Sequence, residues 1–272
     1  MKAELLWTEH ISPASIRMRW RASVDALAFE PGQFYRFTFN DSEGAFERSY
    51  TFAQYEDDCP AGDFDLLISE TKGGRATQLL FDAAPGLNAT LSGPYGRLVL
   101  PDEGRRLFLV ATSAGLAPYL PMLHSLKQST SVPFESVHLL FGLRLPVECL
   151  CRPWLDDLAL NYAWFDWEVF YSQTLPSNPA TNEHQGYVTS GLQNPARFDA
   201  AQDWVLLCAN PMMVDDGFAL MKERGFKSRR VIREKYLFAR QEGKASNLKM
   251  SDADRALLQA KMARYQAAPD PE

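Results

Sequence analysis

The segment Val110–Tyr119 joins an apolar run to small residues and a proline. It reads Val-Ala-Thr-Ser-Ala-Gly-Leu-Ala-Pro-Tyr, so a strand leads into small side chains and then into a helix start. Small side chains let an anion approach the backbone, and free N–H groups at a helix start point toward it. The pattern indicates a phosphate-binding turn, although an ordinary strand-to-helix turn can have the same composition.

A second segment, Arg48-Ser-Tyr-Thr51, places side chains that could bind a ligand on a predicted strand. Successive side chains of a strand alternate between faces, so Arg48 and Tyr50 share one face and Ser49 and Thr51 the other. An arginine beside a tyrosine can hold a phosphate while the ring packs on a flat heterocycle. Taken alone, the same residues are also typical of a polar edge strand.

Two further turns leave structural and functional interpretations open. Gly73-Gly-Arg-Ala-Thr77 predicts a turn with a hydroxyl at the start of a helix over 76–81, either a capped surface helix or a second phosphate contact. Cys208-Ala-Asn-Pro211 ends a strand and begins a helix. A lone cysteine at such a position is more often a core residue than a catalytic one.

The elements that must position these residues divide the chain into two parts. Strand-like runs separated by Gly, Pro and Asp fill about the first hundred residues and predict a small antiparallel barrel or sandwich. Beyond them, apolar runs alternate with helical segments, which predicts a parallel sheet with helices on both faces. These runs are 107–111, 137–141, 167–171 and 204–208, and the helical segments are 117–128 and 212–224, with Gly225 as a C-terminal cap. The tail from 239 is polar, with a helix expected over 251–266.

The order and spacing of six motifs resemble the ferredoxin–NADP reductase superfamily, and its bacterial ferredoxin–NADP reductases in particular. The resemblance spans residues 5–238, and at Thr112-Ser113-Ala114 the chain is bulkier than the family's usual Gly-Thr-Gly. The motifs are Pro31-Gly-Gln33, Arg48-Ser-Tyr-Thr51, Gly93-Pro-Tyr-Gly96, Thr112-Ser-Ala-Gly-Leu-Ala-Pro118, Cys208-Ala-Asn-Pro211 and Glu234-Lys-Tyr236.

The resemblance implies a two-domain fold. An FAD-binding, six-stranded antiparallel β-barrel domain would occupy 1–101, and an NAD(P)-binding α/β domain with a parallel sheet would occupy 102–238. The remaining 239–272 would form a C-terminal tail, part of which we expect to pack beside the active site.

The resemblance also implies roles for individual residues. Arg48 would contact an FAD phosphate, Tyr50 would pack on the isoalloxazine, and Thr51 would hydrogen-bond its reactive edge. Cys208 and Glu234 would flank the site of hydride transfer, and Tyr236 would lie where nicotinamide enters. The other implied cofactor-binding residues are Ser49, Gly74, Thr77, Thr112, Ser113, Gly115, Pro118, Arg144, Asn210 and Pro211; no metal site is implied.

The function implied by the resemblance is that of an FAD-dependent oxidoreductase. It would transfer hydride between NAD(P)H and the flavin and exchange electrons with a ferredoxin or flavodoxin-like protein. The alternatives are a free-flavin reductase, the reductase component of an oxygenase, and a non-catalytic binding module that keeps the fold. The four cysteines lack C-x₄-C-x₂-C spacing, so no fused iron–sulfur cluster of that kind is expected. A hydrolase is disfavoured because no G-x-S-x-G or H-E-x-x-H motif is present.

The nicotinamide nucleotide is expected to be NADH rather than NADPH. Related bacterial reductases hold the 2′-phosphate with several arginines, and Arg144 matches one of them. Gln173 and Tyr187 stand where two others are expected, and neither can give the bidentate charged contact that arginine gives. Arg152 and Arg197 are the residues that could substitute for them.

Composition narrows the setting. The 272 residues carry a net charge of −6, which argues against a nucleic-acid partner because no basic stripe is available. The N-terminal residues contain no long apolar run, so no signal peptide or membrane span is expected. Four scattered cysteines favour a reducing, cytoplasmic location.

Overall fold

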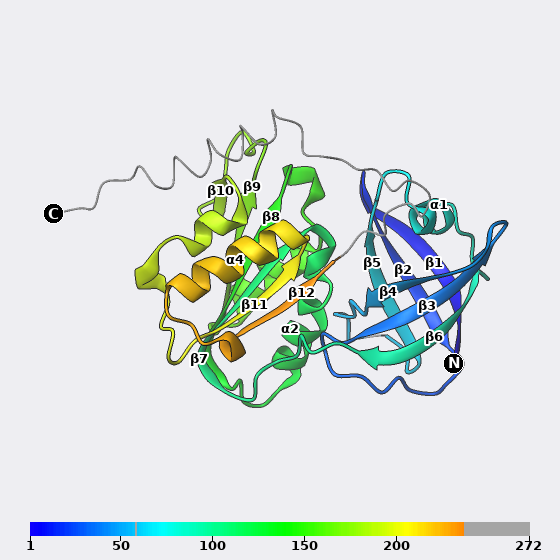
Figure 1. The fold of residues 1–272 in the computed structure, drawn as a ribbon, viewed down its shortest axis with the longest axis horizontal. Coiled ribbons are helices and arrows are strands. Elements are labelled where there is room, and N and C mark those ends of the chain that lie inside the picture. Colours follow the sequence, from blue (N-terminus) through cyan, green and yellow to red (C-terminus); the bar gives the residue numbers. More distant parts are fainter. Residues whose placement is uncertain (58, 237–272) are drawn as a thin grey trace, which may run out of the picture. The chain divides into compact units, whose positions relative to one another are not determined.

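The computed structural model describes residues 1–57 and 59–236, which fall within one unit of the chain. Within that unit, Figure 1 shows a barrel lobe (residues 2–95) and an α/β lobe (residues 104–236). The predictions for the tail, including the helix over 251–266, fall outside the described residues. Among the helices that are described, none has the length and apolar character needed to cross a membrane.

The barrel lobe confirms the predicted antiparallel six-stranded fold. Its strands follow the order β4-β3-β6-β1-β2-β5, with every neighbouring pair antiparallel. An antiparallel bridge between Phe52 and Leu66 joins the two edge strands and closes the barrel. The elements are β1 (Lys2–Ser12), β2 (Ser15–Ala22), β3 (Phe34–Asp41), β4 (Gly44–Thr51), β5 (Asp63–Ser69), α1 (Arg75–Phe81) and β6 (Asn88–Tyr95).

Alternation of side chains explains why these segments form a barrel. In β3, the buried Tyr35, Phe37 and Phe39 alternate with more exposed residues. Trp20 of β2 packs edge-on against Phe37, with ring centroids 6.0 Å apart. Large rings of this kind each remove roughly 150–250 Å² from water, so aromatic burial dominates the stability of this lobe.

The α/β lobe confirms the predicted parallel sheet. Its six strands follow the order β10-β9-β8-β7-β11-β12, and each pairs with its neighbours in parallel. The strands are β7 (Gly104–Thr112), β8 (Phe134–Leu143), β9 (Phe165–Tyr171), β10 (Glu183–Gln185), β11 (Trp204–Ala209) and β12 (Val231–Lys235). The helices are α2 (Tyr119–Gln128), α3 (Arg152–Asn161) and α4 (Pro211–Glu223), with 3₁₀ turns η1 (Ser113–Leu116), η2 (Pro146–Glu148), η3 (Val188–Leu192), η4 (Pro195–Arg197) and η5 (Ser228–Arg230).

Both faces of this sheet are covered, which explains its continuous apolar runs. In β7, Leu107 and Leu109 pack in the core formed with α2 and α3, while Phe108 and Val110 pack in the core formed with α4. A strand buried on both faces needs apolar residues at successive positions rather than at alternate ones.

One predicted helix boundary differs from the structure. The helix expected over 117–128 begins at Tyr119, because residues 113–116 form a 3₁₀ turn that precedes it. The predicted strand segment Arg48–Thr51 forms the end of β4, and the chain turns toward the α/β lobe after Thr51. The cap predicted at Gly225 is confirmed: its φ is +83°, and its N–H donates to the carbonyl of Lys222 at 3.0 Å.

Candidate functional site

The two predicted nucleotide motifs of the α/β lobe meet at the carboxyl edge of its sheet. Thr112 ends β7 and η1 follows it, while Cys208 lies near the end of the neighbouring β11. Gly115 touches β11 so closely that an added Cβ would lie 2.1 Å from the carbonyl oxygen of Cys208. The structure therefore joins the loop Thr112–Pro118 and the Cys208 motif in one constellation.

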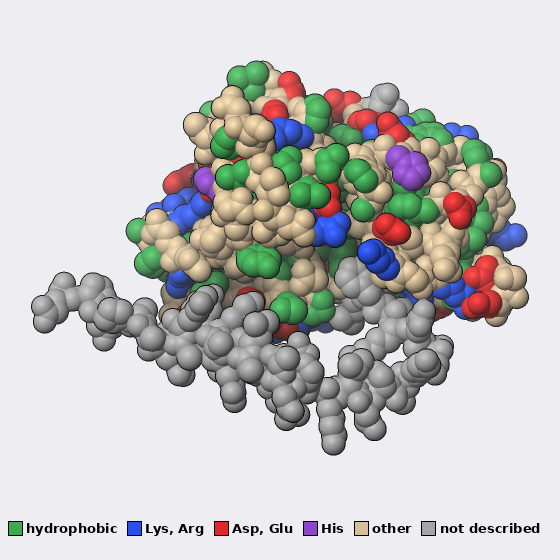
Figure 2. All heavy atoms as spheres, turned by 90° about the horizontal axis from the view of Figure 1, so that it is seen from above, with side chains coloured by type: hydrophobic (Ala, Val, Ile, Leu, Met, Phe, Trp, Pro, Cys, Tyr) green, Lys and Arg blue, Asp and Glu red, His purple; other side chains and the backbone are tan. Residues whose placement is uncertain are grey.

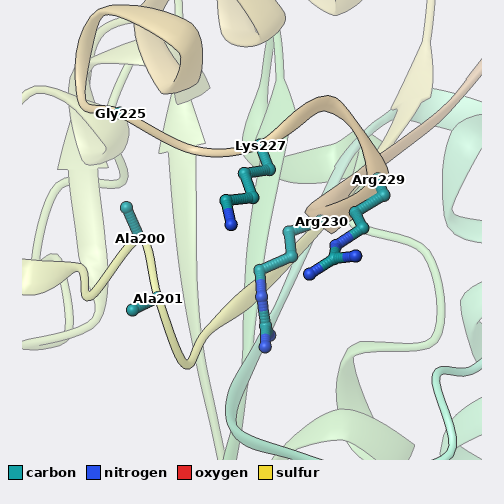
Figure 3. A pocket seen from close by; sticks show the side chains of 6 residues that line it. All are labelled: Ala200, Ala201, Gly225, Lys227, Arg229 and Arg230. Atoms are coloured by element: carbon teal, nitrogen blue, oxygen red, sulfur yellow. The ribbon is translucent and has the colours of Figure 1, made fainter.

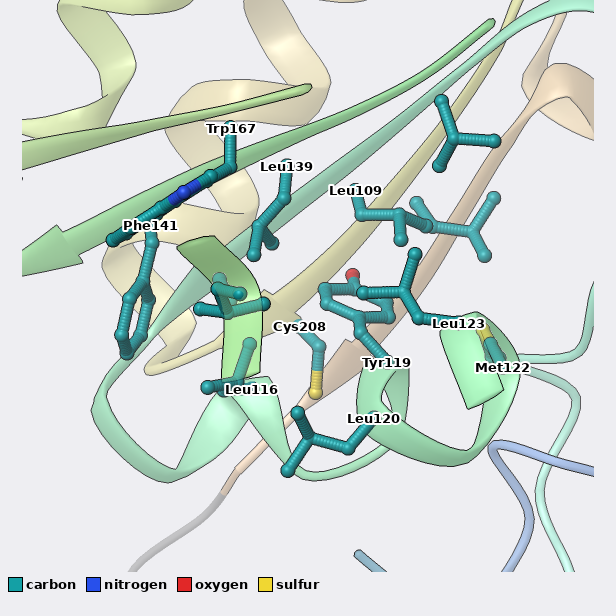
Figure 4. Close-up of a cluster of buried hydrophobic side chains, with 14 of the residues drawn as sticks. Leu109, Leu116, Tyr119, Leu120, Met122, Leu123, Leu139, Phe141, Trp167 and Cys208 are labelled. Carbon is teal, nitrogen blue, oxygen red and sulfur yellow. The ribbon is translucent and has the colours of Figure 1, made fainter. Parts of the chain in front are cut away.

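Cys208 is fully buried at this junction. Its sulfur points in among Leu116, Tyr119 and Leu120 in the core between the sheet and α2 (Figure 4). Burial raises the pKa of the thiol well above its ordinary value, so the group is a neutral thiol at physiological pH. It therefore has the environment of a core residue, at the carboxyl edge of the sheet.

Tyr236 connects this edge to the barrel lobe. Its N–H donates to the carbonyl of Ala209 at 2.8 Å, and its hydroxyl donates to Oγ1 of Thr51 at 3.1 Å. The phenol also lies within hydrogen-bonding reach of the Cys208 thiol. Three residues predicted separately for the site are thus in contact, although Thr51 and Tyr236 are 185 positions apart in the sequence.

Glu234 occupies the same region from β12. It is the register partner of Cys208 in the parallel pair β11–β12, and its Oε2 would lie 3.3 Å from a Cβ added at Gly96. Burial raises the pKa of this carboxyl to about 7. At neutral pH the group therefore exists in comparable protonated and ionised populations, as suits a proton donor or acceptor.

The flavin motif on β4 has the predicted alternation. Phe46, Arg48 and Tyr50 are more buried than Glu47 and Ser49 between them. The ring of Tyr50 packs edge-on against Phe37 at 5.5 Å, so its phenyl face is partly inside the barrel. The guanidinium of Arg48 donates only to the carbonyl of Glu47, at 2.6 Å, and has no ion pair among the described residues. Its charge is therefore available to an anionic ligand.

The turn before α1 brings a second arginine beside the first, which sequence reasoning missed. Arg75 lies 4.4 Å and Arg48 5.4 Å from the ring centroid of Phe46, and Arg75 is held by the carboxylate of Asp41. Gly74 is the N-cap of α1, without a capping side chain. The hydroxyl of Thr77 accepts from the N–H of Thr71 at 3.0 Å, so Thr77 stabilises the turn.

These residues fit a flavin dinucleotide. Arg48 offers an unpaired cation for a phosphate. Gly96 has no side chain, which leaves free the space beside Oε2 of Glu234 that a Cβ would occupy. Tyr50, Thr51 and Tyr236 would border the ring system, with Glu234 beside it. Bound FAD would supply acceptance of a hydride and release of electrons one or two at a time.

Asn210 and Pro211 act at the start of α4. Oδ1 of Asn210 accepts from the N–H of Met213 at 3.1 Å, and Pro211 occupies the first helical turn. Both are typical helix-start residues, so their geometry is explained by capping. Any contact with a nucleotide would come in addition to that role.

The candidate 2′-phosphate region holds arginines that are already paired. Arg144 donates to Glu148 at 2.6 Å, and Gln173 and Tyr187 have no positive charge. The two possible substitutes are also engaged, Arg152 by Glu183 at 2.6 Å and Arg197 by Glu168 at 2.5 Å. A 2′-phosphate bound here would have to compete with these glutamates for the arginines.

A basic cavity of about 260 Å³ lies elsewhere, where β11 and β12 begin. Lys227, Arg229 and Arg230 extend into it opposite Ala200 and Ala201 (Figure 3). This is the amino edge of the sheet, whereas Cys208 and Glu234 lie toward its carboxyl edge. The face shown in Figure 2 carries acidic and basic side chains intermixed rather than one uniformly charged surface.

Known proteins share the sequence of the barrel and the two-domain fold of this chain. Residues 2–100 match the oxidoreductase FAD-binding domain, and the match covers the whole barrel. The whole fold is similar to that of the cytochrome P450 reductase GcoB from Amycolatopsis, with a TM-score of 0.74 and 25% identity over 86% of this chain and 69% of that one. The chain has the two-domain fold of ferredoxin–NADP reductases, and its barrel matches the oxidoreductase FAD-binding domain. The match confirms FAD as the expected cofactor.

Further known proteins are similar to this chain in fold or in sequence. The ferredoxin NADP⁺ reductase of Neisseria gonorrhoeae, solved with bound FAD and NADP, superimposes with a TM-score of 0.73 at 22% identity, over 86% of this chain and 98% of that one. The electron transfer component of toluate 1,2-dioxygenase from Pseudomonas putida is 27% identical over 216 residues, 79% of this chain. The ferredoxin–NAD(+) reductase component of an alkene monooxygenase system from Xanthobacter autotrophicus is 39% identical over 135 residues, 48% of this chain. The chain spans 61% and 39% of the lengths of these last two relatives.

Proposed function

We propose that this protein is an NADH-dependent, FAD-containing reductase that passes electrons to a small redox protein of the ferredoxin or flavodoxin type. The observation that carries the proposal is the meeting of Thr51, Tyr236 and Cys208, which brings the flavin strand and the nucleotide edge of the sheet into contact. An unpaired Arg48 on the same strand supports retention of a flavin phosphate.

The residues of the site have separate tasks in this proposal. Arg48 anchors a phosphate, and the loop Thr112–Pro118 holds the nicotinamide nucleotide against β11. Tyr236 covers the reacting edge through its bond to Thr51, and this bond must open when nicotinamide enters. Glu234 can hold or release a proton at Oε2 near neutral pH. The neutral thiol of Cys208 packs in the core and borders the site from that side.

The paired arginines support NADH as the nucleotide. A 2′-phosphate would have to compete with Glu148, Glu183 and Glu168 for its partners. NADH has no such group and needs no rearrangement. A relative named as a ferredoxin–NAD(+) reductase component also favours this nucleotide.

The decisive experiment is an anaerobic titration of the purified protein. The released flavin is identified by chromatography after denaturation, and flavin reduction is followed in the visible spectrum during addition of NADH. The proposal requires FAD and full bleaching by about one equivalent of NADH. A colourless protein would favour the non-catalytic binding module, and tight FMN would refute the FAD assignment. Saturable reduction of a ferredoxin, measured against reduction of added free flavin, separates the proposal from a free-flavin reductase.

A further inference from the structure

The six residues Phe52–Asp57, here called the strap, leave the flavin strand directly after Thr51. They reach both lobes in turn. Phe52 packs in the aromatic core of the barrel, while the next residue, Ala53, is fully buried in the core between the sheet of the α/β lobe and its helices. The strap therefore begins with one anchor on each side.

The middle of the strap also contacts both lobes. The ring of Tyr55 lies 5.2 Å from that of Trp154 on α3, and its hydroxyl accepts from Arg17 of the barrel at 3.3 Å. The carboxylate of Glu56 accepts from Arg17 at 2.6 and 2.8 Å. Arg17 is itself buried beside Asp65, so the barrel end of this contact is rigid.

The strap ends at Asp57, which binds α2. Its carboxylate lies 2.7 Å from Nε2 of His124, and it accepts from Lys127 at 3.0 Å and from Gln128 at 2.5 Å. These three residues belong to the helix that follows the nucleotide loop Thr112–Pro118. A path of a few residues thus runs from the flavin strand to the helix behind the nucleotide loop.

We propose that Asp57 is a positioning residue, which sets the alignment of the nicotinamide nucleotide with the flavin by holding α2 to the end of β4. The inference rests on the proposed function, because it needs a nucleotide on the loop and a flavin on the strand. Asp57 hydrogen-bonds to none of the three residues predicted to lie at the reacting atoms, Thr51, Cys208 and Glu234, and acts through α2.

Loss of Asp57 is expected to affect the alignment of the nicotinamide nucleotide with the flavin more than the stability of the fold. The side chain of Asp57 is 58% exposed, and exposed ion pairs contribute little to folding. Hydride transfer is far more demanding, since a displacement of about 1 Å can lower a rate by roughly a hundredfold. Loss of Asp57 should therefore slow the reaction without unfolding the protein.

The chain contains a matched control. Asp166 is 60% exposed and accepts from Nδ1 of His138 at 2.8 Å, but both residues lie on neighbouring strands of the α/β lobe. Asp57→Ala and Asp166→Ala each remove an aspartate–histidine pair, one between the lobes and one within a lobe, and Asp57→Ala also removes the contacts with Lys127 and Gln128. Asp57→Asn keeps an acceptor at the strap position and serves as the conservative variant.

The test uses the full-length, FAD-loaded protein in anaerobic stopped-flow with NADH. We expect Asp57→Ala to be reduced about tenfold more slowly at saturating NADH, with a weaker long-wavelength charge-transfer absorbance between nicotinamide and flavin. FAD affinity and melting temperature should match the wild type, Asp166→Ala should behave as wild type, and Asp57→Asn should recover part of the rate.

Two results would overturn the inference while leaving the proposed function intact. In one, Asp57→Ala is reduced at the wild-type rate with an unchanged charge-transfer band. In the other, Asp166→Ala slows to the same extent, which would show a general effect of losing such a pair. A wild-type protein that holds no FAD, or is not reduced by NADH, would instead refute the proposed function and the inference with it.

Discussion

The carboxyl of Glu234 offers a direct test of the electrostatics of the site. Burial raises its pKa from an ordinary 4.5 to about 7, so the folded protein keeps a proton that the unfolded chain has already lost between these two values. The native state is then favoured by this group below pH 4.5, and the advantage disappears as the pH rises to about 7. A shift of this size corresponds to roughly 3 kcal/mol, at about 1.36 kcal/mol for each tenfold change.

Replacing Glu234 by Gln removes the titration while keeping the size of the side chain. The free energy of unfolding of Glu234→Gln relative to wild type should therefore increase with pH, by roughly 2–3 kcal/mol between pH 5 and pH 8. The variant becomes the more stable protein at high pH, because the ionised carboxylate is expensive to bury and the amide is not charged.

The measurement is urea denaturation of the two FAD-saturated proteins at several pH values. Taking the difference at each pH cancels the contributions of all other titrating groups. Glu223→Gln, at an exposed position at the end of α4, provides a control that should show no such trend. A stability difference that stays constant from pH 5 to pH 8 would show that Glu234 is solvated in solution, and the reasoning from burial would be wrong.

Three further outcomes are expected. Arg48→Ala should weaken FAD binding about tenfold to a hundredfold, because a charge-assisted phosphate contact contributes roughly 1.5–3 kcal/mol. Equilibrium dialysis measures the affinity for FAD. An unchanged affinity would show that Arg48 does not contact the phosphate. Cys208→Ala should lower the rate of flavin reduction while FAD stays bound. An unchanged stopped-flow rate would show that Cys208 is a core residue without a role in hydride transfer. With ferricyanide as acceptor, kcat/KM should be at least as high for NADH as for NADPH. A preference for NADPH above about a hundredfold, some 2.7 kcal/mol, would mean that Arg144, Arg152 or Arg197 exchanges its glutamate for the phosphate.

Local patterns predicted the elements of this fold because each pattern has one dominant physical cause. The run 107–111 is apolar at every position, and β7 is indeed buried on both faces. The alternation in Arg48-Ser-Tyr-Thr51 likewise fixed the faces of β4. Helix α3 was not predicted, since the charged Asp156 and Asp157 interrupt its apolar positions and only Leu155 and Leu158 are buried.

Contacts between distant segments could not be predicted from such patterns. The hydrogen bond between Tyr236 and Thr51 depends on how the barrel meets the sheet. The pairing of Asp57 with α2 depends on the path of a segment without secondary structure. The motif resemblance placed residues in a site, but the structure determines which of them are already engaged, as with Thr77 in its turn and Asn210 in its cap.

In the nucleotide loop, the backbone geometry determines which positions can carry a side chain. In Thr112-Ser113-Ala114, which stands where the family usually has Gly-Thr-Gly, Ser113 adopts a φ of +48°, a left-handed conformation that costs a non-glycine residue roughly 1–2 kcal/mol. This strain is local and leaves the loop shape intact. At Gly115, by contrast, any side chain would collide with the backbone of Cys208, since a Cβ would lie 2.1 Å from its carbonyl oxygen. The loop and β11 therefore form one rigid piece, and whatever the loop binds is held in a fixed position relative to Cys208.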